Sequence, residues 1–371
     1  MAFLKYDIKK MMHFSCIAIL CCSIHGDGEK IGVNNGKMAD DLPPEDEVVV
    51  LLKDNNIGKY RIFKQEPTVF KAFKNSGIEI MVGVANFNLQ NMSSNKSAAM
   101  EWVNENIKAY YPATNIKYIA VGNEVLGVPS ASNYVPYLVP AMKNIQEALT
   151  NASLQNKIKV STPLAMDVIG NSISPNNVSP SKVTFIDSVK DQMASILQFL
   201  EDNASPFLAN VFPYKSYLDN SSVGLDFALF NSSAPVVRDG DLIYRNLFDA
   251  MVDAFYSGME GMGYPNIPIV VSATGWPSKG NGDVTTIPNA QNYINNLIRH
   301  VLSNEGTPKR PGRSMETYIF ALFNEDTKTN GQVTEKNYGL FYPDKQPVYS
   351  VDFSPSFSKT VTMLFYIEID E

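Results

Sequence analysis

Eight short apolar runs alternate with segments of helical periodicity, and this alternation limits the fold more than any other feature of the sequence. The runs have the length and β-branched content of strands buried on both faces of a parallel sheet. They cover residues 31–34, 60–63, 78–84, 116–123, 158–161, 207–212, 267–273 and 317–323. The helical segments between them cover residues 46–55, 69–76, 98–110, 135–150, 183–200, 243–259 and 287–302.

A strand followed by a helix, repeated along the chain, requires parallel pairing through right-handed crossovers. Eight such units close into a barrel, so we predict an α/β fold made of a single (β/α)8 TIM barrel over residues 29–353. A doubly wound open sheet is the alternative. However, the turn at residues 34–36 lacks the glycine-rich phosphate loop expected after the first strand of such a sheet.

The two ends of the chain differ in pattern from the barrel region. Lys5, Lys9 and Lys10 precede an apolar segment, residues 14–24, that is too short to span a bilayer. We therefore predict a secretory signal peptide over residues 1–28, with its cleavage site open. Residues 354–371 form a C-terminal tail whose apolar run is shorter than a lipid-anchor signal and is followed by acidic residues, so we expect no stable membrane anchor.

Acceptor sequons for N-glycosylation support secretion independently of the leader. Seven occur in one chain, which predicts an extracellular glycoprotein. They are Asn91, Asn95, Asn151, Asn177, Asn203, Asn220 and Asn231.

Charge and cysteine usage exclude several classes of function. The formal net charge is −7 and no run of Lys or Arg occurs, so nucleic acid is not an expected partner. All three cysteines lie within the leader, and His300 is the one histidine of the chain that remains after it. Disulfides, cysteine nucleophiles and histidine-rich metal sites are therefore not expected, and we predict no metal and no cofactor. We also expect a monomer.

Polar residues follow two of the predicted strands where a barrel opens to ligands. Asn123 and Glu124 end the fourth strand, and the seventh is followed by Gly-Trp-Pro-Ser at residues 275–278. A lone glutamate in this position is often only a solvated loop carboxylate. Because the seventh strand repeats the design of the fourth, we instead interpret Glu124 as a candidate general acid.

Seven motifs distributed over residues 30–353 resemble those of the plant endo-1,3-β-glucanases of glycoside hydrolase family 17. They lie at residues 31–34, 118–125, 210–214, 246–249, 275–278, 307–311 and 338–341. The resemblance implies that 1,3-β-glucan or its oligosaccharides are the partner, with retaining hydrolysis by one glutamate on strand four and another on strand seven. It also implies the plant cell wall or apoplast as the location, with the vacuole as an alternative, and a role in plant defence.

The resemblance assigns roles to individual residues. Glu124, within Gly-Asn-Glu-Val, matches the proton donor of the family. The nucleophile of the family stands two residues before Gly-Trp-Pro-Ser, and this chain has Ala273 there. An alanine cannot attack, and loss of a covalent nucleophile typically costs on the order of 10⁴ in turnover. Hydrolysis is therefore expected to be impaired or absent. Asp283, the next carboxylate along the chain, is a weak substitute because it lies in a loop.

Other family positions are partly kept and partly changed. Glu325 and Lys328 match a supporting acid and base at the end of strand eight. The expected substrate-binding residues are Asn34, Asn123, Tyr214, Tyr217 and Trp276, although Trp276 could equally be a buried wall beneath the site. The positions that depart from the family, which has Tyr, Tyr, Asp and Tyr there, are Asn35, Phe63, Lys64 and Phe212.

Three hypotheses follow from these residues. The first is a glucan-binding protein of the family without hydrolytic activity. The second is an active endo-1,3-β-glucanase that uses an unrecognised route. The third is a structural cell-wall glycoprotein with no affinity for glucan.

Overall fold

The computed structural model describes residues 30–170, 179–220, 222–303, 305–328 and 332–354. The leader, the tail beyond Ser354 and the sequon at Asn177 lie outside these residues. None of the described helices has the length and apolar character needed to cross a bilayer.

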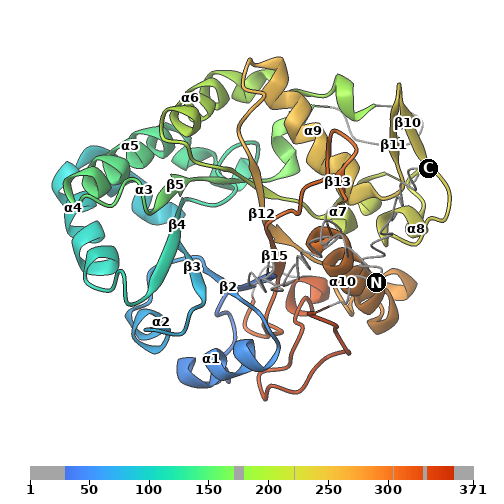
Figure 1. Ribbon diagram of the computed structural model, residues 1–371, viewed down its shortest axis with the longest axis horizontal. Helices are drawn as coiled ribbons and strands as arrows, with labels where there is room; N and C mark the ends of the chain where they lie inside the picture. Colours follow the sequence, from blue (N-terminus) through green and yellow to red (C-terminus); the bar gives the residue numbers. More distant parts are fainter. Residues whose placement is uncertain (1–29, 171–178, 221, 304, 329–331, 355–371) are drawn as a thin grey trace, which may run out of the picture.

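A sheet of parallel strands forms the centre of the molecule, and the helices lie around it (Figure 1). The strand order is β5-β4-β3-β2-β1-β15-β12-β9-β6. The strands are β1 (Gly32–Asn35), β2 (Lys59–Ile62), β3 (Glu79–Val84), β4 (Asn115–Val121), β5 (Lys159–Ser161), β6 (Pro163–Leu164), β9 (Phe207–Asn210), β12 (Ile269–Thr274) and β15 (Thr317–Phe320). The result is a nearly closed (β/α)8 barrel, which confirms the predicted fold.

The fifth barrel strand is divided in two, which explains why nine strands fill eight positions. β5 pairs with β4, and β6 pairs with β9 on the other side. Only Thr162 separates the two strands. Pro163 has no N–H to donate to a neighbouring strand, so the ladder is interrupted at this point.

The major helices match the predicted segments in position. They are α1 (Glu45–Asp54), α2 (Pro67–Ala72), α4 (Lys96–Val103), α5 (Val135–Asn151), α6 (Lys190–Asp202), α9 (Leu247–Gly261) and α10 (Ile287–Leu302). A π-helical segment, Asn104–Lys108, continues α4. Shorter helices α3 (Leu89–Ser94), α7 (Pro213–Asp219) and α8 (Leu225–Ala228) were not predicted.

Two predicted helices begin later than expected because small hairpins occupy their first residues. In the segment 183–200, β8 (Thr184–Phe185) pairs with β7 (Ile169–Gly170) before α6 begins. In the segment 243–259, β11 (Leu242–Tyr244) pairs with β10 (Val237–Asp239). Helix α9 begins after Asn246, whose side chain accepts a hydrogen bond from the Asp249 backbone N–H at 2.7 Å and so caps the helix. A third hairpin joins β13 (Gly306–Thr307) and β14 (Arg310–Pro311).

The barrel interior is packed with side chains rather than open. One hydrophobic cluster is separate from the larger core between sheet and helices, and its members come from five different strands. It consists of Met81, Tyr118, Ala120, Leu208, Val270 and Tyr318. Because the interior is filled, a ligand site has to lie at an end of the barrel.

Candidate active site

Glu124 follows β4 at the carboxyl ends of the strands, in a backbone turn that three hydrogen bonds hold. Its φ is +51°, in the left-handed region that a residue with a Cβ rarely adopts. Its N–H donates to the carbonyl of Pro163 at 2.9 Å. The Asn86 side chain accepts from the Asn123 N–H at 2.8 Å and donates to the Asn123 carbonyl at 3.0 Å. The direction of the Glu124 side chain is therefore set by the turn.

The Asn210 side chain, at the end of β9, joins this turn to β12. Its amide nitrogen donates to Glu124 Oε1 at 2.7 Å and to Asn123 Oδ1 at 3.2 Å. Its amide oxygen accepts from the Ser272 hydroxyl at 2.8 Å. Asn210 therefore orients the Glu124 carboxylate while it is itself held by a neighbouring strand.

A buried arginine lies under the same group of side chains. Arg61 of β2 is only 1% exposed, and its guanidinium donates to Asn123 Oδ1 at 2.7 Å and to the Ser272 carbonyl at 2.8 Å. Burial lowers its pKa to about 10, against the opposing effect of the negative charge of Glu124. Arg61 is thus still protonated at neutral pH and places a positive charge beneath the site.

The site opens into a pocket of about 330 Å³. Glu124 and Ala273 both line it. Aromatic rings and charged groups form much of the wall. The other lining residues are Gly36, Met38, Phe63, Asn123, Asn210, Phe212, Lys215, Phe320, Glu325, Lys328, Glu335 and Tyr338.

A second pocket, of about 380 Å³, continues the first along the barrel face. Glu124, Asn210, Phe212 and Lys215 line both pockets. Its further lining includes Asp167 and residues of α7. The two together form an extended cleft with Glu124 between them, a shape suited to a chain-like ligand.

Ala273 presents only a methyl group to this cleft. It belongs to β12, its carbonyl accepts from the Val211 N–H at 2.8 Å, and it is 2% exposed. Arg61 binds the residue that precedes Ala273 and the residue that precedes Glu124. The two positions are therefore held by one buried cation.

Glu325 and Lys328 reach the same pocket from the segment after β15. Glu325 is 2% exposed, and its Oε2 lies 2.9 Å from Lys328 Nζ. Lys328 also lies 3.7 Å from a Glu335 carboxylate oxygen and 4.3 Å above the centre of the Phe320 ring.

Comparison with known proteins fits this geometry. The model of glycosyl hydrolases family 17 matches residues 31–353. The chain belongs to this family. A probable glucan endo-1,3-beta-glucosidase of Arabidopsis thaliana is 43% identical over 328 residues, covering 88% of this chain and 92% of the relative. A glucan endo-1,3-beta-glucosidase of Vitis vinifera is 44% identical over 327 residues, with the same coverage.

A solved structure supports the same assignment. CJP38, a beta-1,3-glucanase and allergen of Cryptomeria japonica pollen, is 60% identical, with a TM-score of 0.85. The match covers 88% of this chain and all of that chain. The sequence-based recognition of family 17 is thereby confirmed.

The aromatic residues expected to stack on sugar in this family 17 chain are mostly buried. Trp276 has no exposed surface, and its indole N–H donates to the Val284 carbonyl at 3.0 Å. Tyr214 is 3% exposed and packs edge-on against Trp276, with ring centroids 5.2 Å apart. The prediction that these two side chains stack on a ligand is wrong, and the alternative of a wall beneath the site describes Trp276.

Two further predicted binding residues also do not line the cleft. Tyr217 is half-buried, with its ring 6.2 Å from that of Trp276. Asn34 has no exposed surface, and its amide donates to the Ile319 carbonyl at 3.2 Å inside the sheet. Direct sugar contact by Asn34 is therefore also a wrong prediction.

No role was predicted for Arg61 and Asn210, the two residues that organise the site. Both lie in runs that were interpreted as ordinary strands. A fully charged side chain within an apolar run was the available signal for Arg61, since such a group is buried only with partners. Asp283, considered as a substitute carboxylate, is exposed and does not line the pocket.

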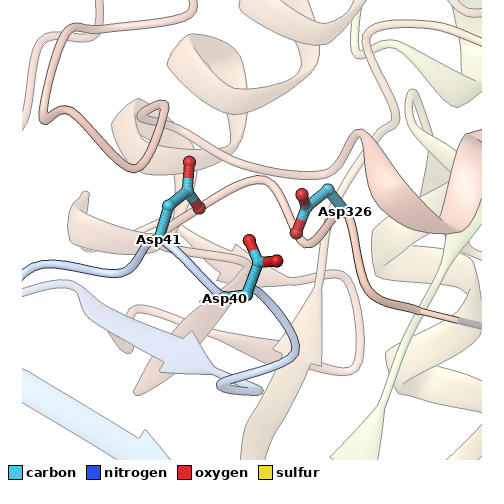
Figure 2. A group of neighbouring side chains, drawn as sticks. All are labelled: Asp40, Asp41 and Asp326. Atoms are coloured by element: carbon cyan, nitrogen blue, oxygen red, sulfur yellow. The ribbon is translucent and has the colours of Figure 1, made fainter.

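Within the described part of the chain, one group of acids could be considered for a metal ion. Asp40, Asp41 and Asp326 come from the segments after β1 and β15, and their carboxylates face one another (Figure 2). One oxygen of each lies within 4.8 Å of the others, and all three residues are exposed. Exposed acidic groups of this kind are common without an ion, and none of the three lines the cleft. The absence of a metal or cofactor stays a prediction.

The predicted glycosylation positions within the described residues are accessible to different degrees. Asn203 and Asn220 are half-buried. The exposed positions are Asn91, Asn95, Asn151 and Asn231.

Proposed function

We propose that this family 17 protein binds 1,3-β-glucan in the cleft past Glu124 and does not hydrolyse it by the double displacement of retaining glycosidases. The observation that carries the proposal is that Ala273 lies in the same pocket as Glu124 and provides a methyl group. Retaining hydrolysis needs two carboxyl groups about 5 to 5.5 Å apart, one as acid and one as nucleophile.

The acid half of that chemistry is supported by the geometry around Glu124. The Asn210 amide orients its carboxylate, which lies in an extended cleft lined by both apolar and polar side chains. Glu124 would protonate the oxygen of a leaving glycosyl group. Without a nucleophile, the anomeric carbon of the bound sugar would have no protein group to attack it.

The other carboxylates of the pocket are less suited to replace the nucleophile. Glu325 Oε2 forms an ion pair with Lys328 at 2.9 Å, and the positive charge of the lysine reduces the nucleophilicity of the carboxylate. Glu335 lies on the short helix η8 (Val333–Lys336) and faces the same lysine at 3.7 Å. Nevertheless, Glu325 lines the cleft, which favours an active glucanase with an unusual nucleophile as the second candidate function.

Calorimetry with laminarihexaose tests the proposal, with cellohexaose as the matched control. We expect laminarihexaose to bind with a dissociation constant in the micromolar to millimolar range (~10⁻⁶ to 10⁻³ M) and cellohexaose more weakly. No heat and no competition at millimolar ligand would instead support a structural glycoprotein without glucan affinity. Laminarin hydrolysis that disappears in Glu325→Gln would favour the second candidate.

We also propose that the protein is a secreted, monomeric glycoprotein of the plant cell wall or apoplast, or of the vacuole. The leader-like segment 1–28 and the sequons support secretion. Expression of the full chain in plant cells should yield an extracellular product whose mass falls on treatment with an N-glycosidase. A product retained in the cytoplasm with an unmodified mass would contradict secretion.

A further inference from the structure

A surface rich in lysine lies at the amino ends of the barrel strands, at the end of the barrel opposite the cleft. Two pockets of about 420 and 440 Å³ open there, and Lys117 of β4 lines both. We call the lysines that line one pocket or the other the lysine face. They are Lys30, Lys53, Lys59, Lys117, Lys157 and Lys159.

The register of the strands explains why these lysines gather at one end of the barrel. Lys59 begins β2 and pairs with Glu79 at the start of β3. Lys159 begins β5 and pairs with Tyr118 of β4, while Lys30 lies two residues before β1. Strands β1 to β5 are neighbours in the sheet. Because neighbouring strands lie about 4.8 Å apart, the lysine face extends over roughly 20 Å.

The two carboxylates on this surface, those of Glu79 and Glu316, are already bound by lysines of the same set. Lys117 Nζ lies 3.0 Å from a Glu79 oxygen and 3.1 Å from a Glu316 oxygen. Lys59 Nζ lies 3.6 Å from the other Glu316 oxygen, and the Tyr118 hydroxyl donates to Glu316 at 3.0 Å. Two of the six lysines therefore balance both negative charges.

The other four lysines have no ion-pair partner among the residues that the structure describes. They are Lys30, Lys53, Lys157 and Lys159. Lys53 and Lys157 are exposed, and the other two are half-buried. The chain as a whole carries a formal net charge of −7, so this end of the barrel is a local concentration of positive charge on an acidic protein. Such a concentration attracts an anion that spans several of the lysines.

The donor groups of the two pockets indicate which kind of anion fits. None of the described residues that line them is an arginine, the side chain that binds phosphate through two parallel hydrogen bonds. Lysine ammonium groups are point charges, and spread over roughly 20 Å they suit single carboxylates repeated along a chain. Amide and hydroxyl groups that can bind sugar hydroxyls line the same pockets. They belong to Asn56, Ser76, Asn115 and Ser314.

We propose that the lysine face binds a linear polymer of uronic acid sugars. The carboxylates of the polymer contact the lysine ammonium groups, and its hydroxyls contact the neighbouring amides and hydroxyls. This second polysaccharide site goes beyond the proposed function and does not depend on it. Because the cleft and the lysine face open at opposite ends of the barrel, one molecule can hold a neutral and an acidic polysaccharide together.

Calorimetry of the full-length chain with decagalacturonate tests the proposal. The protein is produced without N-glycans, because the carbonyl of the sequon residue Asn203 accepts from Lys159 Nζ at 2.9 Å. We expect a dissociation constant below ~10⁻³ M at low salt. The affinity should fall at least tenfold at about 0.5 M NaCl, where the screening length is roughly 4 Å.

Two further ligands define the chemistry that the lysine face recognises. The fully methyl-esterified decamer has the same sugar chain without its charges, and we expect it not to bind. Equal binding of the esterified and the free decamer would overturn the inference. Polyphosphate with the same number of charges should bind more weakly, because its charges lie closer together than the lysines. Tighter binding of polyphosphate would assign the lysine face to phosphate chains instead.

A pair of substitutions tests the role of the lysines. Lys53→Gln/Lys157→Gln removes one exposed lysine from each pocket and breaks no ion pair among the described residues. The affinity for decagalacturonate should fall at least tenfold. The matched control, Lys143→Gln/Lys279→Gln, removes two exposed lysines that line neither pocket, and its affinity should stay within about twofold. Unchanged affinity in the first variant, or an equal loss in both, would overturn the inference.

Binding of laminarihexaose separates this inference from the proposed function. Its affinity should be the same for the natural protein and for Lys53→Gln/Lys157→Gln, because the cleft lies at the other end of the barrel. If decagalacturonate binds and laminarihexaose does not, the uronate site stands and the proposed function fails. If laminarihexaose alone binds, the uronate site is excluded. An equal loss of both ligands in the variant would contradict separate sites and overturn the inference.

Discussion

The buried side chain of Asp253, outside the cleft, predicts how the free energy of unfolding depends on pH. Asp253 of α9 has no exposed surface, and its Oδ2 accepts from the Tyr244 hydroxyl at 3.0 Å and from the Lys309 backbone N–H at 2.9 Å. Burial raises its pKa from 3.8 to about 6, and these hydrogen bonds only partly oppose the shift. The folded protein therefore binds a proton at Asp253 more tightly than the unfolded chain does.

The sign of the pH dependence follows from this difference. Protonation of Asp253 adds to the free energy of unfolding as pH falls through about 6, and the gain is complete below about 4. A shift of about two pKa units corresponds to roughly 3 kcal/mol. Asp253→Asn keeps an oxygen that can accept both hydrogen bonds but does not titrate, so it lacks this term.

Urea unfolding of both proteins, followed by circular dichroism at pH 7, 5.5 and 4, measures the effect. The stability of the natural protein relative to the Asp253→Asn variant should rise by about 3 kcal/mol from pH 7 to pH 4. Other titrating groups are common to both proteins and cancel in the difference. A difference that stays constant with pH, or that changes in the opposite direction, would refute the reasoning.

Three further predictions concern the site and a helix pair. Arg61→Met removes the buried donor to Asn123 and to a β12 carbonyl. Urea unfolding should therefore show a free energy of unfolding lower by about 3 to 5 kcal/mol. A decrease below about 1 kcal/mol would contradict this expectation. Gly36→Ala would place a Cβ 2.2 Å from Glu325 Oε1 and so displace this carboxylate. Laminarihexaose should then bind about tenfold more weakly in calorimetry, while the circular dichroism spectrum is unchanged. Unaltered affinity would count against a role for Glu325. Burial lowers the pKa of His300, but the hydrogen bond and charge of Asp249 outweigh it and raise the pKa overall. The pairing stabilises the folded protein below pH 6.5, and this stabilisation is lost as pH rises through the raised pKa of His300. In urea unfolding, His300→Gln should therefore lower the free energy of unfolding by about 1 to 2 kcal/mol at pH 5 and by less at pH 9. An equal loss at both pH values would contradict the pairing.

The barrel could be predicted because its strands are buried on both faces and therefore have continuous apolar sequences. The pattern does not show where pairing stops, so the division of the fifth strand at Pro163 was not anticipated. Helical periodicity also failed at residues 183–189 and 243–246, where short hairpins precede α6 and α9. Such hairpins are too short to have a period of their own.

The site was predictable only where a residue stands at the end of a strand. Glu124 and Ala273 share the pocket because the carboxyl ends of parallel barrel strands meet on one face. The contact of Arg61 with the Ser272 carbonyl joins residues 211 positions apart, and no local pattern indicates it. The burial of Trp276 could not be predicted either, since an aromatic side chain after a strand can face the ligand or the core.

The release of reducing ends from laminarin by the natural protein and by Ala273→Glu tests the central claim most directly. Ala273→Gln, which has the size of the glutamate without its charge, is the matched control. We expect no release by the natural protein or the Gln variant, and release by the Glu variant greater by about 10³ or more. Hydrolysis by the natural protein as fast as by the Glu variant would contradict the assignment of Ala273 to the nucleophile position. A folded but inactive Glu variant would show that Asn35, Phe63, Lys64 and Phe212 have already altered the site beyond the loss of one carboxylate.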